Sequence, residues 1–113
     1  MILVSNDLMV VSRVQGAAAI AGTTVEVVSS VAGAGDSLRD KAAELVIVDL
    51  GCSTADLDEQ IGNLKSMTSA PLLIVAFGPH VHENRLAAAR AAGCDVVMSR
   101  GQFFGQIDAL LSK

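Results

Sequence analysis

The sequence predicts one three-layer α/β domain, in which a five-stranded parallel sheet is covered by helices on both faces. Apolar runs rich in β-branched residues alternate with helical patterns along all 113 residues. These runs are continuously apolar, which is typical of parallel strands buried on both faces. A hydrophobic content of 51% with only 3% aromatic residues favours an aliphatic core. At this length we expect a single domain, residues 1–113.

Each predicted strand is followed by a predicted helix, and this order requires crossover connections of one hand. The predicted strands are residues 2–5, 24–29, 45–50, 72–77 and 95–98. The predicted helices are residues 7–21, 36–43, 56–67, 81–92 and 101–112.

Capping residues support the boundaries of the first two helices. Asn6 or Asp7 is a suitable N-cap for the first helix, and Gly22 is a suitable C-terminal stop. Residues 31–35 carry a Gly-x-Gly pattern without the third glycine of a dinucleotide-binding loop. We interpret this segment as a flexible turn before a second helix that begins at Asp36.

The later helices carry signals of the same kind. Ser53 with Asp56 resembles a capping box at the start of the third helix. Leu86 and Ala89 give the fourth helix an apolar face, and Gly93 follows as its stop.

Composition excludes several classes of function. A net charge of −4 argues against a surface for nucleic acid or anionic membranes, because both need clustered Lys and Arg. No positively charged segment precedes the apolar N-terminus, so we expect no signal peptide. Two cysteines without metal-ligand spacing favour a cytoplasmic protein. No nucleotide, flavin or nucleophile motif is present, so we expect no enzyme.

Three segments in the expected order resemble the receiver domain of bacterial response regulators. They are ELVIVDL at 44–50, APLLIVA at 70–76 and AARAAGCD at 88–95. The resemblance covers the whole chain and implies a flavodoxin-like (βα)5 fold, in agreement with the order of elements. It also implies a phosphoacceptor at Asp49, which ends the third strand.

In receivers, the phosphoacceptor works with an acid pair that binds Mg²⁺, a hydroxyl residue and a lysine. The present sequence departs from this set at each partner. Ser5 and Asn6 stand where the acid pair is expected, and Asp7 comes one residue late. Ala76 replaces the hydroxyl residue, and Arg100 stands in place of the lysine. The resemblance is therefore to a degenerate receiver, and we expect no metal and no cofactor.

Three interpretations of Asp49 stay open. In the first, Asp49 pairs with Arg100 across the strand ends, since a guanidinium matches a carboxylate in a bidentate manner. In the second, Asp49 caps the following helix or bonds loop amides. In the third, it is an atypical phosphoacceptor of a two-component phosphorelay. We expect Mg²⁺-dependent phosphorylation to be weak, because neutral oxygens replace two charged ligands.

The resemblance implies a protein partner, or a second copy of the chain, rather than turnover. The implied contact face comprises the fourth helix, fifth strand and fifth helix, where Val97 takes the position of an aromatic switch residue. Its candidate residues are Arg85, Arg90, Met98, Gln102, Phe103 and Phe104. The two adjacent phenylalanines cannot both face the core, so one is a candidate anchor unless helix curvature half-buries both. A small-ligand-binding module at the strand ends is the alternative.

Other reactive side chains carry weaker signals. His80 and His82 follow the fourth strand, but without a cysteine cluster their spacing favours a polar loop over a zinc site. Cys52 and Cys94 are predicted at opposite edges of the sheet, which excludes a disulfide between them. We expect both to be small, buried or half-buried thiols.

Overall fold

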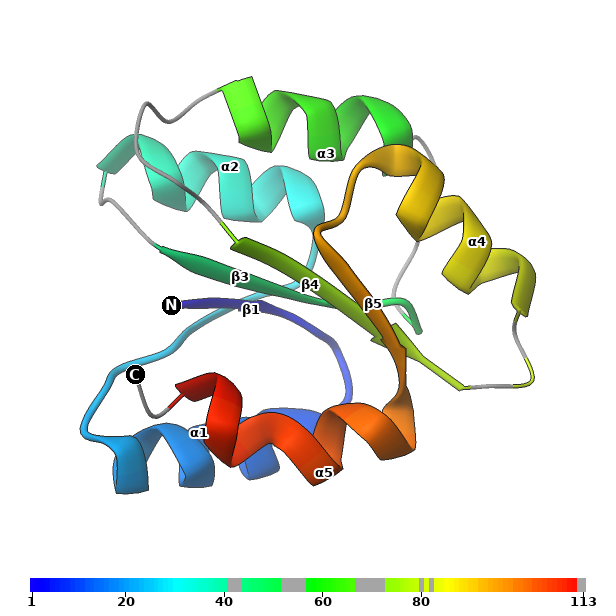
Figure 1. Cartoon of the computed structure of the whole chain (residues 1–113). Coiled ribbons are helices and arrows are strands. Elements are labelled where there is room, and N and C mark those ends of the chain that lie inside the picture. The colour runs from blue at the N-terminus through cyan, green and yellow to red at the C-terminus, as the bar shows by residue number, and fades with distance from the viewer. Residues whose placement is uncertain (41–43, 52–56, 67–72, 80, 82, 112–113) are drawn as a thin grey trace.

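A parallel sheet runs through the centre of the molecule, with helices above and below it (Figure 1). The computed structural model describes residues 1–113 except 41–43, 52–56, 67–72, 80, 82 and 112–113. Within these residues the strands are β1 (Ile2–Val4), β2 (Glu26–Val28), β3 (Leu45–Asp49), β4 (Leu73–Gly78) and β5 (Val96–Ser99). The helices are α1 (Leu8–Ala21), α2 (Val31–Asp40), α3 (Leu57–Ser66), α4 (Glu83–Ala92) and α5 (Arg100–Leu111).

The strand order is β2-β1-β3-β4-β5, and every described pair is parallel. Helices α2, α3 and α4 cover one face of the sheet, while α1 and α5 lie together on the other (Figure 1). The predicted flavodoxin-like three-layer fold is therefore confirmed. None of the helices in the described part of the chain has the length and apolarity needed to span a bilayer.

Burial on both faces explains why the strands have continuously apolar sequences. Alternate residues of a strand point to opposite faces. Ile2 and Val4 therefore pack under α2, α3 and α4, while Leu3 between them packs under α1 and α5. All three are at most 3% exposed. A parallel sheet with helices on both faces needs this pattern, because neither face meets water.

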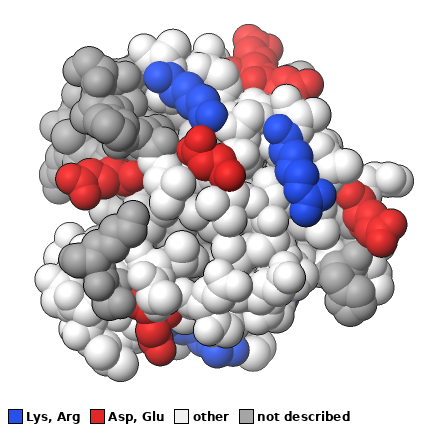
Figure 2. Space-filling view, viewed as in Figure 1, with Lys and Arg blue, Asp and Glu red and all other residues white. Residues whose placement is uncertain are grey.

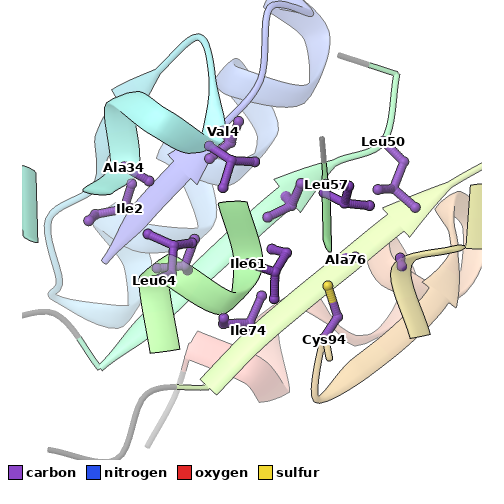
Figure 3. Close-up of a cluster of buried hydrophobic side chains, with 14 of the residues drawn as sticks. Ile2, Val4, Ala34, Leu50, Leu57, Ile61, Leu64, Ile74, Ala76 and Cys94 are labelled. Carbon is purple, nitrogen blue, oxygen red and sulfur yellow. The ribbon is translucent and has the colours of Figure 1, made fainter. Parts of the chain in front are cut away.

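The two cores differ in side-chain chemistry. The core under α2, α3 and α4 is built from aliphatic residues and the Cys94 thiol (Figure 3). The core under α1 and α5 contains the fully buried rings of Phe77 and Phe103, which stack with centroids 4.1 Å apart. Phe104 meets Phe103 edge-on at 5.2 Å, so all three phenylalanines of the chain gather on this face.

Helix α1 begins and ends where its sequence predicts. The Asp7 carboxylate accepts hydrogen bonds from the Met9 and Val10 amides as an N-cap. Gly22 has φ of 74°, the left-handed conformation that closes a helix C-terminus at little cost for glycine. The Gly93 stop after α4 is also confirmed, with φ of 105°. The predicted capping box at Ser53 and Asp56 lies outside the described residues.

The prediction for residues 31–35 is wrong, because α2 begins at Val31 rather than Asp36. Ser30 caps this helix: its Oγ accepts from the Gly33 amide at 3.0 Å, and its carbonyl accepts from the Ala34 amide at 3.1 Å. Val31 and Ala34 are buried in the core at 3% and 0% exposure. Burial of these two side chains and the serine cap offset the low helix propensity of the glycines.

Candidate functional site

Asp49 ends β3 at the carboxyl edge of the sheet and is 5% exposed. Both of its carboxylate oxygens accept hydrogen bonds from the chain. The Ser5 hydroxyl donates to Oδ2 at 2.8 Å, and the Gly51 amide donates to Oδ1 at 2.9 Å. Such bonds compensate for burying a charged group that would otherwise lose its hydration.

The parallel pairing of β1 with β3 brings Ser5 to this carboxylate. Val4 pairs with Val48, so the residues that follow them, Ser5 and Asp49, lie side by side at the same edge of the sheet. Ser5 is 3% exposed, and its Oγ also accepts from the Asp7 amide at 3.1 Å. One hydroxyl thus connects the buried carboxylate to the residues that begin α1.

Asp7 lies at the rim and makes its own set of bonds. Its Oδ1 caps α1, and its Oδ2 accepts from Nη2 of Arg100 at 3.1 Å. Both side chains of this ion pair are between a third and a half exposed. The Arg100 hydrogen bond, followed by the Met9 amide, holds the pKa of Asp7 below its usual value.

The first interpretation of Asp49, an ion pair with Arg100, is therefore wrong, because Arg100 pairs with Asp7. The second, a bond to a loop amide, is confirmed at Gly51. Arg100 is the first residue of α5, and its guanidinium lies 5.8 Å from the centre of the Phe104 ring at the half-exposed rim. If Arg100 bonded to Asp49 instead, its charge would be buried beside a carboxylate whose two oxygens already accept hydrogen bonds. Burying the guanidinium carries a desolvation penalty, which Arg100 avoids by staying at the rim.

The end of β4 offers the site no hydroxyl. Ala76 is fully buried opposite Val48, and Phe77 is the residue paired with Asp49. Asn6 is exposed on the loop after β1. Across the described part of the chain, no three His, Cys, Asp or Glu side chains come together as a metal site. The predicted candidates Cys52, His80 and His82 lie outside that part.

Solved structures provide the comparison. No protein-family model matches the sequence, and no curated protein matches it. A response regulator from Hahella chejuensis superposes with a TM-score of 0.78 at 20% identity, covering 98% of this chain and 90% of that one. A CheY-like protein, TadZ, from Pseudomonas aeruginosa PAO1 gives 0.73 at 22% identity, with coverages of 96% and 92%. The chain has the receiver-domain fold.

A third similar structure is that of an atypical orphan response regulator with a phosphorylation-independent regulatory mechanism. It gives a TM-score of 0.73 at 13% identity, covering 97% of this chain and 92% of that one. Identities this low establish the shared fold alone. Within that fold, this chain has an aspartate at the end of β3 and a serine beside it at the end of β1.

The predicted partner face of the receiver fold is corrected at two positions. Met98 is 6% exposed and Phe103 is 0% exposed, so both belong to the core under α1 and α5. Phe104 is half-buried, and the Arg13 guanidinium covers its ring at 4.1 Å. The adjacent phenylalanines are therefore one core residue and one covered residue, because helix α5 lies close against α1.

The arginines of α4 remain at the surface. Arg85 and Arg90 are exposed, and Arg90 lines a groove with Leu86, Ala87 and Gln102 between α4 and α5. Arg85 also donates from Nη1 to the Leu50 carbonyl at 3.1 Å, tying α4 to the loop after β3. No sequence signal indicates this bond, since the two residues are 35 positions apart.

Cys94 is a buried thiol, as predicted. It is 9% exposed, and burial raises its pKa to about 11. A thiol with so high a pKa carries almost no thiolate near neutrality and is a poor nucleophile or metal ligand.

Proposed function

We propose that this chain is a receiver-like signalling domain that acts by contact with a protein partner and is not switched by Mg²⁺-dependent phosphorylation of Asp49. In this proposal the domain is of the pseudo-receiver type, turns over no substrate and holds no cofactor. The hydrogen bond from Ser5 Oγ to Asp49 Oδ2, at 2.8 Å between two buried side chains, carries it.

This bond occupies the position that metal-assisted chemistry needs. A phosphoacceptor carboxylate must bind Mg²⁺ through one oxygen while the other attacks phosphorus. Here Ser5 and the Gly51 amide each hold one of the two oxygens. Metal binding at one oxygen and attack on phosphorus by the other would compete with both bonds, at a site that offers one charged ligand.

Asp7 does not supply the missing charge. Its carboxylate is used by the first amides of α1 and by Arg100, 3.1 Å away. Turning it toward Asp49 would remove a helix cap, which contributes about 1 kcal/mol, and leave Arg100 without this ion pair.

Ala76 removes a further contact. A hydroxyl at the end of β4 would bond a phosphate oxygen, and a charge-assisted bond of that kind contributes about 1.5–3 kcal/mol. Alanine has no polar side-chain atom and lies in a fully buried position. The phosphorylated state would therefore lack a contact that stabilises it relative to the free state.

The first test is chemical phosphorylation. Incubation with acetyl phosphate and Mg²⁺, followed by intact-mass measurement, should leave the wild-type mass unchanged. An added phosphoryl group that disappears in Asp49→Asn would contradict the proposal and favour the atypical phosphoacceptor instead.

A second test restores the acid pair. The double variant Ser5→Asp with Asn6→Asp should bind Mg²⁺ at least about tenfold more tightly than wild type, because it returns two charged ligands. Mg²⁺ titration followed through the Gly51 amide NMR signal measures this. Asn63→Asp with Asn84→Asp is the control, since it adds the same charge at exposed helix positions. Equal Mg²⁺ affinity in wild type and the Ser5/Asn6 variant would contradict the proposal.

A further inference from the structure

The outer face of α1 is apolar although it lies at the surface. Its inner residues Val10 and Val14 are fully buried, as expected for a helix on a sheet. On the opposite side Leu8, Met9 and Ile20 are 84%, 70% and 88% exposed. Large apolar side chains that gather at the surface often mark a contact site for another molecule. We use the name outer face of α1 for Leu8, Met9, Ser12, Gly16, Ala19 and Ile20, all of which are exposed.

This surface is also poor in charge. On the side seen in Figure 2, more charged side chains lie over the half of the molecule that contains α2, α3 and α4 than over the half with α1 and α5. Arg13 is the single charged residue of α1, and its guanidinium lies 4.1 Å from the centre of the Phe104 ring. An acidic or basic partner would therefore find no complementary charges on the outer face. A second copy of the same neutral surface would meet no repulsion there, although the chain as a whole carries −4.

Along one ridge of the outer face, the order of side-chain sizes is the same in both directions. Leu8, Ser12, Gly16 and Ile20 follow one another at intervals of four and form one ridge of the helix. The ridge has large residues at its ends and small ones at its centre. A two-fold axis between Ser12 and Gly16 would place Leu8 of each copy opposite Ile20 of the other. Such self-complementarity is what a two-fold interface requires.

Within the described residues, nothing requires a glycine at position 16, which is also true of the helical glycines Gly62, Gly101 and Gly105. A Cβ added at Gly16 would meet no atom within 4 Å, and the residue is helical rather than left-handed. Glycine destabilises a helix interior relative to alanine, so its presence is unfavourable for α1 alone. Glycine does allow another backbone to approach closely.

We propose that two copies of the chain associate through the outer faces of α1, packed antiparallel about a two-fold axis near Ser12 and Gly16. The interface is short, because a helix of 14 residues is about 21 Å long. We therefore expect a reversible dimer with a Kd above about 10 µM, as small interfaces give. The proposal is independent of whether Asp49 is phosphorylated.

Sedimentation velocity from about 10 µM to about 1 mM tests this association. Gly16→Glu should raise the dimer Kd at least about tenfold, because it places bulk and like charges at the centre of the contact. Gly62→Glu is the matched control: Gly62 is an exposed glycine of α3 whose added Cβ would also meet no atom within 4 Å. Its Kd should stay within about twofold of wild type. Circular dichroism confirms that both variants fold.

Charge pairing tests the antiparallel arrangement. Leu8→Glu and Ile20→Lys should each weaken the dimer, while the double variant should bind at least about fivefold more tightly than either single variant, because Glu and Lys then meet across the axis. Three results would overturn the proposal. They are a monomeric wild type at about 1 mM, equal weakening by Gly16→Glu and Gly62→Glu, and a double variant no tighter than the single ones. If the wild type is monomeric, the outer face of α1 does not bind a second copy of the chain, and a different partner has to be sought for it.

Discussion

The two helical layers cover the same sheet but present different surfaces. Helices α2, α3 and α4 carry nine charged residues: Asp36, Arg39, Asp40, Asp58, Glu59, Lys65, Glu83, Arg85 and Arg90. Helices α1 and α5 carry three: Arg13, Arg100 and Asp108. Of these three, Arg13 lies over the Phe104 ring and Arg100 pairs with Asp7. The fold requires apolar residues on the inner side of each layer and leaves the outer side unconstrained. Packing against the sheet therefore does not account for the exposed Leu8, Met9 and Ile20 of α1.

The cores beneath the two layers differ as well. Aliphatic side chains fill the space under α2, α3 and α4, whereas stacked aromatic rings fill the space under α1 and α5. A large aromatic side chain places much of the buried apolar surface of a core at one position. A single substitution should therefore damage the α1/α5 layer more than a comparable change damages the other.

The largest expected effect is that of Phe103→Ala. It should lower the free energy of unfolding by about 3–5 kcal/mol, because it removes a fully buried ring that stacks on Phe77. Ile61→Ala, a comparable truncation of a fully buried side chain in the opposite core, should cost less, near the lower end of about 2–5 kcal/mol. Urea denaturation measures both. A loss for Phe103→Ala no greater than that for Ile61→Ala would show that the two layers do not differ in this way.

Alkaline pH should weaken the layer under α2, α3 and α4 through Cys94. Burial raises the thiol pKa from 9.0 to about 11, so the unfolded chain releases this proton first as pH rises. Stability should fall between about pH 9 and pH 11 by roughly 2–3 kcal/mol more in wild type than in Cys94→Ala. The buried side chains of the core under α1 and α5, as far as it is described, have no titratable group. Parallel pH profiles for the two proteins would contradict the prediction.

Ser5→Ala contrasts the buried strand-end site with the open surface of α1. The variant should lose about 1.5–3 kcal/mol of unfolding free energy, because the buried Asp49 carboxylate loses a charge-assisted bond. Ser12→Ala on the outer face of α1 should change stability by at most about 0.5 kcal/mol. Both variants are measured at protein concentrations below those at which the proposed dimer forms. A large loss of unfolding free energy for Ser12→Ala in the monomer would mean that this face already makes contacts within the chain.

The smallest expected effect on stability is that of Asp7→Asn, at the rim of the α1/α5 layer. Asn caps helices as well as Asp does, so Asp7→Asn removes the charge and keeps the cap. The pKa of Asp7 lies below its ordinary 3.8 in the folded chain, so the unfolded chain takes up the proton first as pH falls. The stability contributed by the ion pair is present above pH 3.8 and is lost below it. Acid unfolding curves should be flatter for Asp7→Asn, and identical curves would exclude this contribution.

Much of the fold was predictable because its signals are local. The continuous apolar runs and the helix caps specify element type and order without long-range information, and Gly22 and Gly93 mark stops that the structure confirms. The second helix shows the limit of this approach. Two glycines predicted a turn, but burial of Val31 and Ala34 against the sheet stabilises a helix instead. Propensity is a weak preference that packing overrides.

At the strand ends, the sequence determined which groups are available: one aspartate after β3, a serine and an asparagine after β1, and an alanine in β4. Only the tertiary structure decided how they pair. Ser5 and Asp49 are 44 residues apart, and Asp7 and Arg100 are 93 apart. These pairings follow from strand register and from depth below the surface. A buried carboxylate took the neutral hydroxyl beside it, while the guanidinium stayed with the carboxylate nearer to water, where less hydration is lost.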